Sequence, residues 1–299
     1  MTTGRQFSPG ARLRSLMDAG CVMAPGAFNG LAGRVIAQIG FDACYVSGAA
    51  TSVCAGVPDV GILTLDHFSR IVREVADGSG LPVLADADTG FGEEEMVRRT
   101  VVEYARAGAA GLHIEDQVFP KRCGHLDGKT LMTPEQACSR IQWAAKAARE
   151  YGDGSFIVCA RTDARGVDGF DAAVDRAKRY VDAGASMIFP EGLATEEEFL
   201  KFVQALRPGD NGPYMLANMT EFGKTPIIPH EQFAAMGYSI VIYPVTTLRL
   251  AMGAVMRGLK SLKDTGSVAD VLDQMQTRKE LYEAIGYTPG EPWEFPIGQ

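Results

Sequence analysis

One unit recurs along this chain of 299 residues and limits the folds that it can adopt. Each copy has an amphipathic helical stretch, a glycine, and a short apolar run that ends in polar residues. The clearest joints are IGFDACYVSG, AGAAGLHIED, AGASMIFPEG and MGYSIVIYPV, at residues 39–48, 107–116, 183–192 and 236–245. Glycine commonly ends helices, and aliphatic runs favour strands, so the sequence predicts regular alternation of helix and strand.

Eight such strands can be placed, and their apolar runs are continuous, as expected of strands that are buried on both faces. They lie near residues 22–26, 43–48, 82–88, 110–116, 156–163, 186–192, 214–220 and 239–245. Eight alternating units predict an α/β protein with a (β/α)₈ TIM-type barrel, formed by a single domain of residues 1–299. A doubly wound open sheet is the alternative, but PGAFNG at 25–30 does not supply the glycine-rich phosphate turn that it needs.

Two segments exceed a minimal barrel. The loop after the fourth strand, at about 117–132, is long, and we expect it to act as a mobile lid before a helix opened by the capping box Thr133-Pro134-Glu135-Gln136. Residues 268–299 form a C-terminal helical extension in which 268–286 is predicted to be one amphipathic helix. Its apolar face must pack along its own barrel or on a neighbouring subunit.

Composition and charge exclude several classes of partner. Hydrophobic residues make up 46% and charged residues 22%, which is sufficient for a large core. The net charge of −8 argues against nucleic acid or an anionic membrane as partner. No apolar run reaches the roughly 20 residues of a membrane span, and the N-terminal stretch lacks a hydrophobic signal core. We therefore expect a cytoplasmic protein.

Of the six cysteines, one has an unusual setting. No two cysteines form a C-x-x-C pair, which argues against a zinc site or a disulfide framework. Cys123 lies in FPKRCGHLDGK, where Lys121, Arg122 and His125 would favour its thiolate form. Such a thiol can exchange a proton with a carbanion or act as a nucleophile, and the alternative is an incidental loop cysteine.

Polar residues at the carboxyl ends of the strands are candidates for the active site of a barrel. Asp86 and Asp88 should share a face of the third strand, and Glu115 ends the next strand. Such a cluster of carboxylate oxygens suits Mg²⁺ or Mn²⁺. Alternatively, Asp88 caps the following helix and Asp86 pairs with an arginine.

The arginines Arg161, Arg249 and Arg278 indicate the substrate class. A guanidinium matches a carboxylate, so several arginines at one barrel mouth predict a small polycarboxylate substrate. The alternative is that each arginine neutralises a neighbouring acid, as Arg161 could do with Asp163. Backbone N–H groups of residues 47–49 could also bind an anion.

Ten motifs together resemble one known family: YVSGA, GVPDVG, DADTGFG, GLHIEDQ, KRCGH, ARTDA, FPEG, NMTEFGKTP, YPVTTLRLAM and MQTRKELYE. Across nearly the whole chain they resemble the isocitrate lyase/phosphoenolpyruvate mutase superfamily, and most of all its 2-methylisocitrate lyase branch. KRCGH marks the lyases, since mutase-type members carry no cysteine there. True isocitrate lyases are much longer chains with an inserted region.

The resemblance implies Mg²⁺-dependent, retro-aldol cleavage of 2-methylisocitrate to pyruvate and succinate, in the methylcitrate cycle of propionate catabolism. It implies that Asp86 and Asp88 hold the metal, that Asp59 and Glu115 support its hydration shell, and that Cys123 is the catalytic acid. Gly124 and His125 would lie beside Cys123, and we expect Tyr45 to be the base, with its pKa lowered by the metal. The implied substrate-binding residues are Ser47, Gly48, Ala49, Gly124, Arg161, Glu191, Asn218, Thr220, Arg249 and Arg278. A homotetramer that exchanges the helix after the eighth strand is also implied.

Two departures from the family leave the exact substrate open. KRCGH is followed by LDGK, where these lyases often have a more basic run, and SGAATSVCAGVPD at 47–59 differs in detail and is expected to line the pocket for the substrate methyl group. Another 2-hydroxy-diacid lyase, of the dimethylmalate type, is the first alternative. An oxaloacetate hydrolase or decarboxylase is the second, and a non-catalytic binder that kept the barrel is the third.

Overall fold

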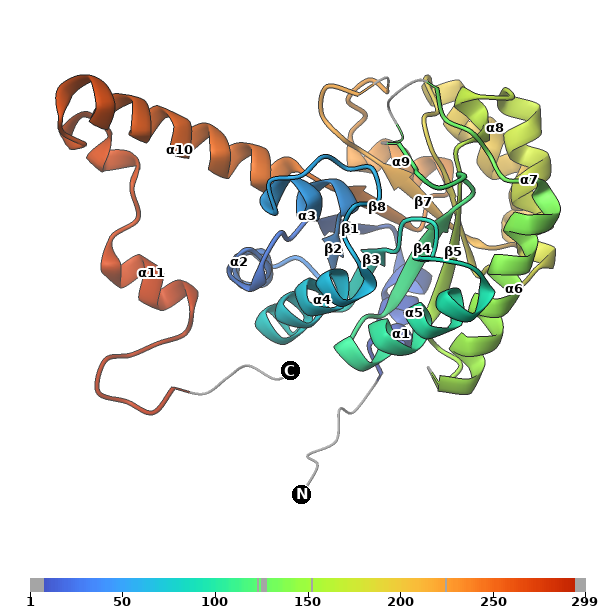
Figure 1. Ribbon diagram of the computed structural model, residues 1–299, viewed down its shortest axis with the longest axis horizontal. Coiled ribbons are helices and arrows are strands. Elements are labelled where there is room, and N and C mark those ends of the chain that lie inside the picture. The colour runs from blue at the N-terminus through green and yellow to red at the C-terminus, as the bar shows by residue number, and fades with distance from the viewer. Residues whose placement is uncertain (1–7, 123, 125–127, 152, 224, 294–299) are drawn as a thin grey trace.

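The computed structural model describes residues 8–122, 124, 128–151, 153–223 and 225–293. Within them, parallel strands form one eight-stranded sheet in the order β1-β8-β7-β6-β5-β4-β3-β2. β1 and β2 meet through a bridge between Gly26 and Tyr45, which nearly closes a (β/α)₈ barrel as predicted (Figure 1). The strands are β1 (Val22–Pro25), β2 (Cys44–Val46), β3 (Val83–Asp86), β4 (Gly111–Glu115), β5 (Ile157–Thr162), β6 (Met187–Pro190), β7 (Tyr214–Asn218) and β8 (Ile240–Tyr243).

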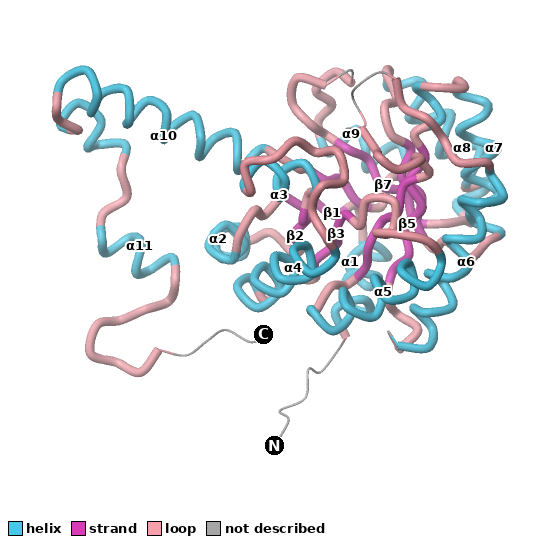
Figure 2. The backbone as a smooth tube through the Cα atoms, in the orientation of Figure 1, coloured by secondary structure: helices cyan, strands magenta, loops and turns pink. Residues whose placement is uncertain are grey.

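Helices surround the strands, as the tube view makes plain (Figure 2). Several of them end at the glycines that the repeat contains: Gly40, Gly108 and Gly237 adopt left-handed φ values of 96°, 93° and 93°, which glycine reaches without steric cost. The outer helices are α2 (Gly30–Ile39), α4 (Leu65–Ser79), α5 (Glu94–Ala107), α6 (Pro134–Tyr151), α7 (Phe170–Asp182), α8 (Glu196–Leu206) and α9 (His230–Met236). A short α3 (Gly48–Cys54) and the 3₁₀ turns η1 (Ala164–Gly166) and η2 (Pro208–Asp210) lie in connections.

The predicted start of α6 is confirmed. Gln136 N donates to Thr133 Oγ1 at 3.3 Å, and Thr133 N donates to Gln136 Oε1 at 3.0 Å, so the capping box is complete. Among the described helices, none combines the length and apolar character that a bilayer-crossing segment requires.

The strand period of two separates the barrel interior from the layer under the helices. Along β3, Leu84 packs in the interior cluster, whereas Val83 and Ala85 pack in the cluster beneath the helices. One helix that the repeat did not predict, α1 (Pro9–Ala19), places Leu13 and Met17 in the interior cluster. Apolar side chains therefore fill the lower end of the barrel, where the strands begin. The upper end, where the strands end, is left for polar residues.

The C-terminal part departs from the prediction. Residues 268–286 are not one helix, because Met275 is extended between the 3₁₀ turn η3 (Ala269–Gln274) and α11 (Arg278–Ala284). Thr277 starts α11 with a second capping box. Hydrogen bonds from Arg34 to the Ile285 carbonyl, at 2.8 Å, and from Gln38 to the Glu283 carbonyl, at 3.0 Å, hold α11 against α2.

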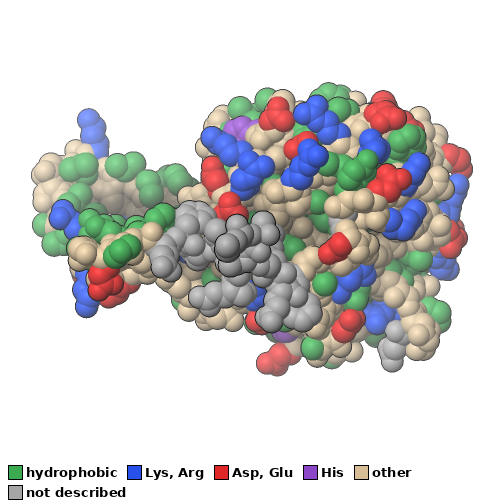
Figure 3. All heavy atoms as spheres, turned by 90° about the horizontal axis from the view of Figure 1, so that it is seen from below, with side chains coloured by type: hydrophobic (Ala, Val, Ile, Leu, Met, Phe, Trp, Pro, Cys, Tyr) green, Lys and Arg blue, Asp and Glu red, His purple; other side chains and the backbone are tan. Residues whose placement is uncertain are grey.

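Between the barrel and η3, the 20-residue α10 (Thr246–Thr265) projects away from the rest of the molecule (Figure 1). Only Leu248 of this helix is buried, and Leu250, Met256 and Leu259 are exposed by 71%, 69% and 60%. Hydrophobic side chains gather along this projecting part of the surface (Figure 3). Among the residues that the structure describes, the apolar face of α10 therefore has no covering layer.

Candidate active site

The upper end of the barrel holds a cavity of about 150 Å³ that collects most of the predicted site residues. They reach it because inward positions alternate along parallel strands, whose carboxyl ends all lie at this end. The predicted residues that line the cavity are Tyr45, Ser47, Ala49, Asp59, Asp86, Gly124, Arg161, Glu191, Asn218, Thr220 and Arg249. Residues from seven strands, β2 to β8, or from the segments that follow them thus converge on one small space.

Some predicted residues do not line this cavity. Gly48 donates its N–H to Asp86 Oδ2 at 3.1 Å, so its amide already binds an anion of the protein itself. Glu115 lies beside Arg161, and Arg278 begins α11, which packs on α2. Cys123 and His125 lie outside the described residues.

Asp86 and Asp88 do not lie along one strand face as predicted, but their carboxylates still come close together: a Cβ added to Gly48 would lie 2.6 Å from Asp86 Oδ2 and 3.3 Å from Asp88 Oδ1. β3 ends at Asp86, and Asp88 has a left-handed φ of 46°, so the two-residue period does not extend to it. The turn is fixed by a hydrogen bond from Asp88 N to Asp86 Oδ1 at 2.9 Å. Asp86 consequently lines the central cavity, whereas Asp88 lines a neighbouring one.

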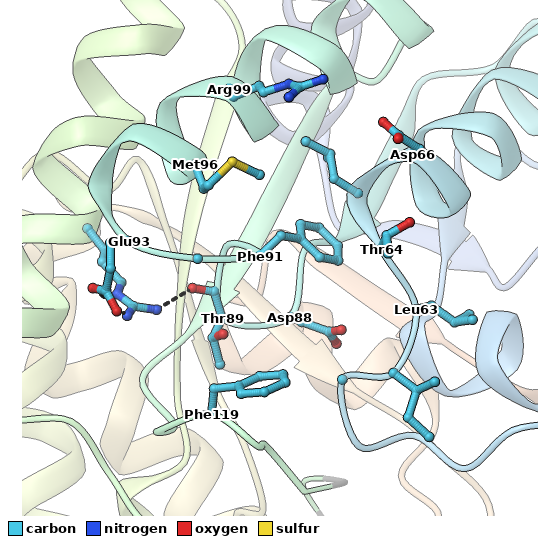
Figure 4. A pocket seen from close by; sticks show the side chains of 15 residues that line it. Leu63, Thr64, Asp66, Asp88, Thr89, Phe91, Glu93, Met96, Arg99 and Phe119 are labelled. Atoms are coloured by element: carbon cyan, nitrogen blue, oxygen red, sulfur yellow. Dashed lines mark hydrogen bonds and ion pairs between the residues drawn. The ribbon is translucent and has the colours of Figure 1, made fainter.

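That neighbouring cavity is larger, at about 530 Å³, and lies between the loops before α4 and α5 (Figure 4). Asp88 points into it toward Thr64 and Leu63, and the rings of Phe91 and Phe119 flank it. Asp88, Glu93, Arg99 and Arg140 are among its lining residues, whereas Asp59, Asp86, Arg161, Glu191 and Arg249 line the smaller cavity. Arg161, Arg249 and three of the five predicted acids therefore lie at the smaller cavity.

Tyr45, His113 and Asp86 form a buried column below the cavity. Tyr45 Oη and His113 Nε2 are hydrogen-bonded at 2.7 Å, and His113 Nδ1 lies 3.7 Å from Asp86 Oδ1. Burial lowers the pKa of His113 to about 4. Burial, and then the charge of Asp86, raise the pKa of Tyr45 well above its usual value. The protein groups thus shift Tyr45 in the opposite direction from the predicted one and favour its protonated form.

Lys121 is a site residue whose partners the sequence did not reveal. Its side chain is buried, its Nζ lies 2.7 Å from Asp88 Oδ1, and it also forms an ion pair with Asp59. Burial opposes the charge on Lys121, but the nearby carboxylates, above all Glu115 and Asp88, outweigh it and raise the pKa of the ammonium. Lys121 therefore serves as a counter-ion for the carboxylates of Asp59, Asp86, Asp88 and Glu115, which together form the acidic side of the barrel mouth.

Arg161 is the centre of the charged network. Its guanidinium reaches Asp163 at 3.0 Å, Glu115 at 3.2 Å and Glu191 at 3.5 Å, and it lies over the Phe189 ring at 5.2 Å. Arg161 therefore pairs with Asp163, as the alternative interpretation holds, and it also lines the cavity, where its role in substrate binding stays a prediction.

A second lysine that the sequence interpretation did not include, Lys129, joins this network. Its Nζ lies 2.9 Å from Asp163 Oδ1 and also donates to the carbonyl oxygen of Gly124. Lys129 is the lysine of LDGK, so the motif that departs from the family contains the signal that could have identified it.

Arg249 lies at the outer edge of the cavity. Its Nη1 is 3.2 Å from Glu221 Oε2, and its guanidinium stacks over the ring of Phe222 at 5.1 Å. Glu221 also accepts a hydrogen bond from Thr246 at the start of α10. Glu221 and Phe222 line the cavity as well, although the sequence interpretation gave neither a role.

The acidic side of the mouth fits a hydrated divalent cation. Within the described part of the chain, the buried oxygens Glu115 Oε1 and Asn218 Oδ1 have no hydrogen-bond partner, so both are acceptors available to a ligand. Within the described ranges, no three His, Cys, Asp or Glu side chains are close enough together to hold an ion directly. Carboxylate oxygens are the ligands that Mg²⁺ and Mn²⁺ prefer, directly or through water, and this mouth supplies them.

Comparisons with known proteins show the family of this chain. Residues 13–263 match the family model described as phosphoenolpyruvate phosphomutase. The chain is 49% identical over 263 residues to the probable 2-methylisocitrate lyase 2 of Corynebacterium glutamicum, covering 88% of this chain and 83% of the relative. It is 46% identical over 280 residues to the 2-methylisocitrate lyase of Aeropyrum pernix, covering 93% and 88%.

Solved structures give the same result. A crystal structure of 2,3-dimethylmalate lyase, described as a PEP mutase/isocitrate lyase superfamily member, matches with a TM-score of 0.87 at 36% identity, covering 94% of this chain and 92% of the other. Phosphonopyruvate hydrolase in complex with oxalate and Mg²⁺ matches with a TM-score of 0.82 at 30% identity, covering 94% and 95%. Both likenesses extend over the whole barrel.

The buried column predicts a pH dependence. Because the pKa of His113 falls from 6.5 to about 4 on folding, the unfolded chain binds a proton at this residue between these two pH values and the folded chain does not. The cost of folding with a neutral His113 is absent above pH 6.5. Below this value the free energy of unfolding falls as the pH drops toward 4, by about 1.4 kcal/mol per pH unit at most. The ring resonances of ¹³C-labelled histidine, with His113→Gln for assignment, should give a midpoint near 4. A midpoint near 6.5 would contradict the buried, neutral state.

Proposed function

This chain belongs to the phosphoenolpyruvate mutase/isocitrate lyase superfamily, and we propose that it is a carbon–carbon lyase that cleaves 2-methylisocitrate to pyruvate and succinate. The observation that carries the proposal is the convergence of acids and arginines on one small cavity, in a chain whose relatives are named 2-methylisocitrate lyases. We place the reaction in the methylcitrate cycle of propionate catabolism, in the cytoplasm.

Two cations of the chain are suited to hold the substrate. Arg161, on β5, and Arg249, on α10, both line the cavity, and each can bind one carboxylate of a polycarboxylate. Glu191, Asn218 and Thr220 add hydrogen-bonding groups between them. Because Arg161 is fixed by three acids, its charge is already in place when charge moves onto the leaving fragment.

We propose Mg²⁺, with Mn²⁺ as a possible substitute, held by Asp86 and Asp88 with Asp59 and Glu115 around its water molecules. When bound, the ion supplies a Lewis acid for the oxygen that becomes the pyruvate carbonyl. Support comes from the free buried oxygens and from the Mg²⁺ named with the related hydrolase.

Tyr45 and Cys123 are the proposed proton-transfer residues. Tyr45 lines the cavity and would take the substrate hydroxyl proton; neutralising the Asp86 charge, which helps to raise its pKa, favours that role. Cys123 would protonate the succinate carbanion, with His125 beside it on the loop. Its chain neighbour Gly124 lines the cavity, which supports a thiol at the same position.

The substrate prediction is tested with purified protein and a panel of diacids. With Mg²⁺ present, 2-methylisocitrate should yield pyruvate and succinate, and EDTA should abolish the reaction, since the acidic mouth would lose its cation. Isocitrate, which would release glyoxylate, is the matched control. Preferred turnover of 2,3-dimethylmalate or of oxaloacetate would replace the proposal with one of the alternatives, and absence of any EDTA-sensitive turnover would favour a non-catalytic binder.

Replacement of the proposed acid separates binding from chemistry. Cys123→Ser should reduce kcat by about 10²-fold or more while leaving Mg²⁺ and substrate affinity, measured by calorimetry, nearly unchanged. Cys54→Ser is the control, because this exposed cysteine lies outside the cavity. Full activity of Cys123→Ser would rule out its role as the acid.

We also propose a homotetramer whose subunits exchange α10, because no residue in the described part of the chain covers the apolar face of this helix. Leu259→Lys should shift the assembly toward smaller species in light scattering, since it places a charge in the buried contact. Leu200→Lys makes the same change at an exposed position of α8 and should leave the assembly intact. An unchanged mass for Leu259→Lys would argue against the exchange.

A further inference from the structure

Lys129 is a buried cation that no part of the proposed chemistry uses. Its side chain is only 5% exposed, although lysine is rarely buried without a specific partner. Its Nζ contacts two groups, the carboxylate of Asp163 at 2.9 Å and the carbonyl oxygen of Gly124. Asp163 pairs with Arg161, which lines the cavity, and Gly124 lines the cavity itself, so both groups connect Lys129 to the cavity.

The first path runs through Asp163 to Arg161. Asp163 receives Arg161 Nε at 3.0 Å and Arg161 Nη2 at 3.2 Å, so it fixes the guanidinium in two places. Arg161 forms ion pairs with three buried acids, namely Glu115, Asp163 and Glu191. Lys129 supplies the second positive charge, which leaves Arg161 less completely neutralised by Asp163 and available to a substrate carboxylate.

The second path runs through the backbone of Gly124. A Cβ added to Gly124 would lie 2.6 Å from Glu191 Cγ and would also collide with Arg161 Nη2. The Gly124 backbone therefore rests directly on these two side chains, and only glycine permits that approach. A shift of Gly124 requires a shift of Arg161 or Glu191, and the reverse also holds.

We propose that Lys129 is a positioning residue of the reaction. Its one ammonium group binds both the Gly124 backbone and Asp163, and so holds Gly124 and the Asp163–Arg161 pair in fixed positions relative to each other. Lys129 does not line the cavity and does not touch the substrate. It acts through Arg161, which binds the substrate, and through the main chain next to the proposed acid. The inference rests on the proposed lyase function.

A merely structural role would have different consequences. A lysine that only stabilises the fold would, when replaced, lower stability and leave kcat of the folded fraction unchanged. A positioning residue changes kcat more than KM, because a small displacement of a reacting group slows the chemical step while ground-state contacts persist. A cation of similar reach should restore the function.

The experiment compares Lys129→Met with Lys129→Arg in the full chain. Lys129→Met should lower kcat for 2-methylisocitrate on the order of 10- to 100-fold with a smaller change in KM. Lys129→Arg, which can still bind both oxygens, should recover most of the loss. Lys201→Met is the control, since Lys201 is an exposed lysine with one ion pair, to Glu197, and it should behave as the unaltered protein.

Hydrogen exchange provides a second readout that does not depend on turnover. Peptides that cover 117–132 should exchange on the order of tenfold faster in Lys129→Met than in Lys129→Arg, because an anchor of the main chain is lost. Should Lys129→Met fail to fold, Lys129→Gln serves the same comparison.

Equal kcat in Lys129→Met and the unaltered protein, or an equal loss in Lys129→Arg, would overturn the proposal, as would unchanged exchange of 117–132. If the unaltered protein releases no pyruvate, the proposed function fails by itself. The exchange data then still decide whether Lys129 holds this segment to the barrel.

Discussion

The charged layer around Arg161 is the interaction on which the upper barrel depends. Three acids and one guanidinium lie buried there, and a buried charge is costly unless opposite charges and hydrogen bonds compensate it. Lys121 and Lys129 extend the compensation toward Asp88 and Asp163. The same layer that would bind a diacid therefore also decides whether the top of the barrel can be buried at all.

The lower barrel contrasts with this layer. Leu13 and Met17 of α1 enter the interior with Leu84 and other apolar side chains, so water is excluded from below. His113 and Tyr45 stand at the boundary between the two regions. Their pKa shifts follow from this position, because burial disfavours the charged form of either ring.

The sequence was sufficient for the strands and for the residue types at their ends, because continuous apolar runs and helix-closing glycines are local signals. It was not sufficient for pairings: Lys121 meets Asp88, and Lys129 meets Asp163, only after distant segments fold together. It failed at Asp88, where a left-handed turn ends the strand period. The break before α11 was readable, since Thr277 and Glu280 form a capping box that the amphipathic pattern masked.

The projecting α10 makes the stability of the fold sensitive to the concentration of the protein. A helix whose leucines and methionines remain in water gains nothing from the hydrophobic effect until another surface covers it. If association provides that cover, mass action makes the melting temperature rise with protein concentration. Dilution would then act on this barrel as a mild denaturant.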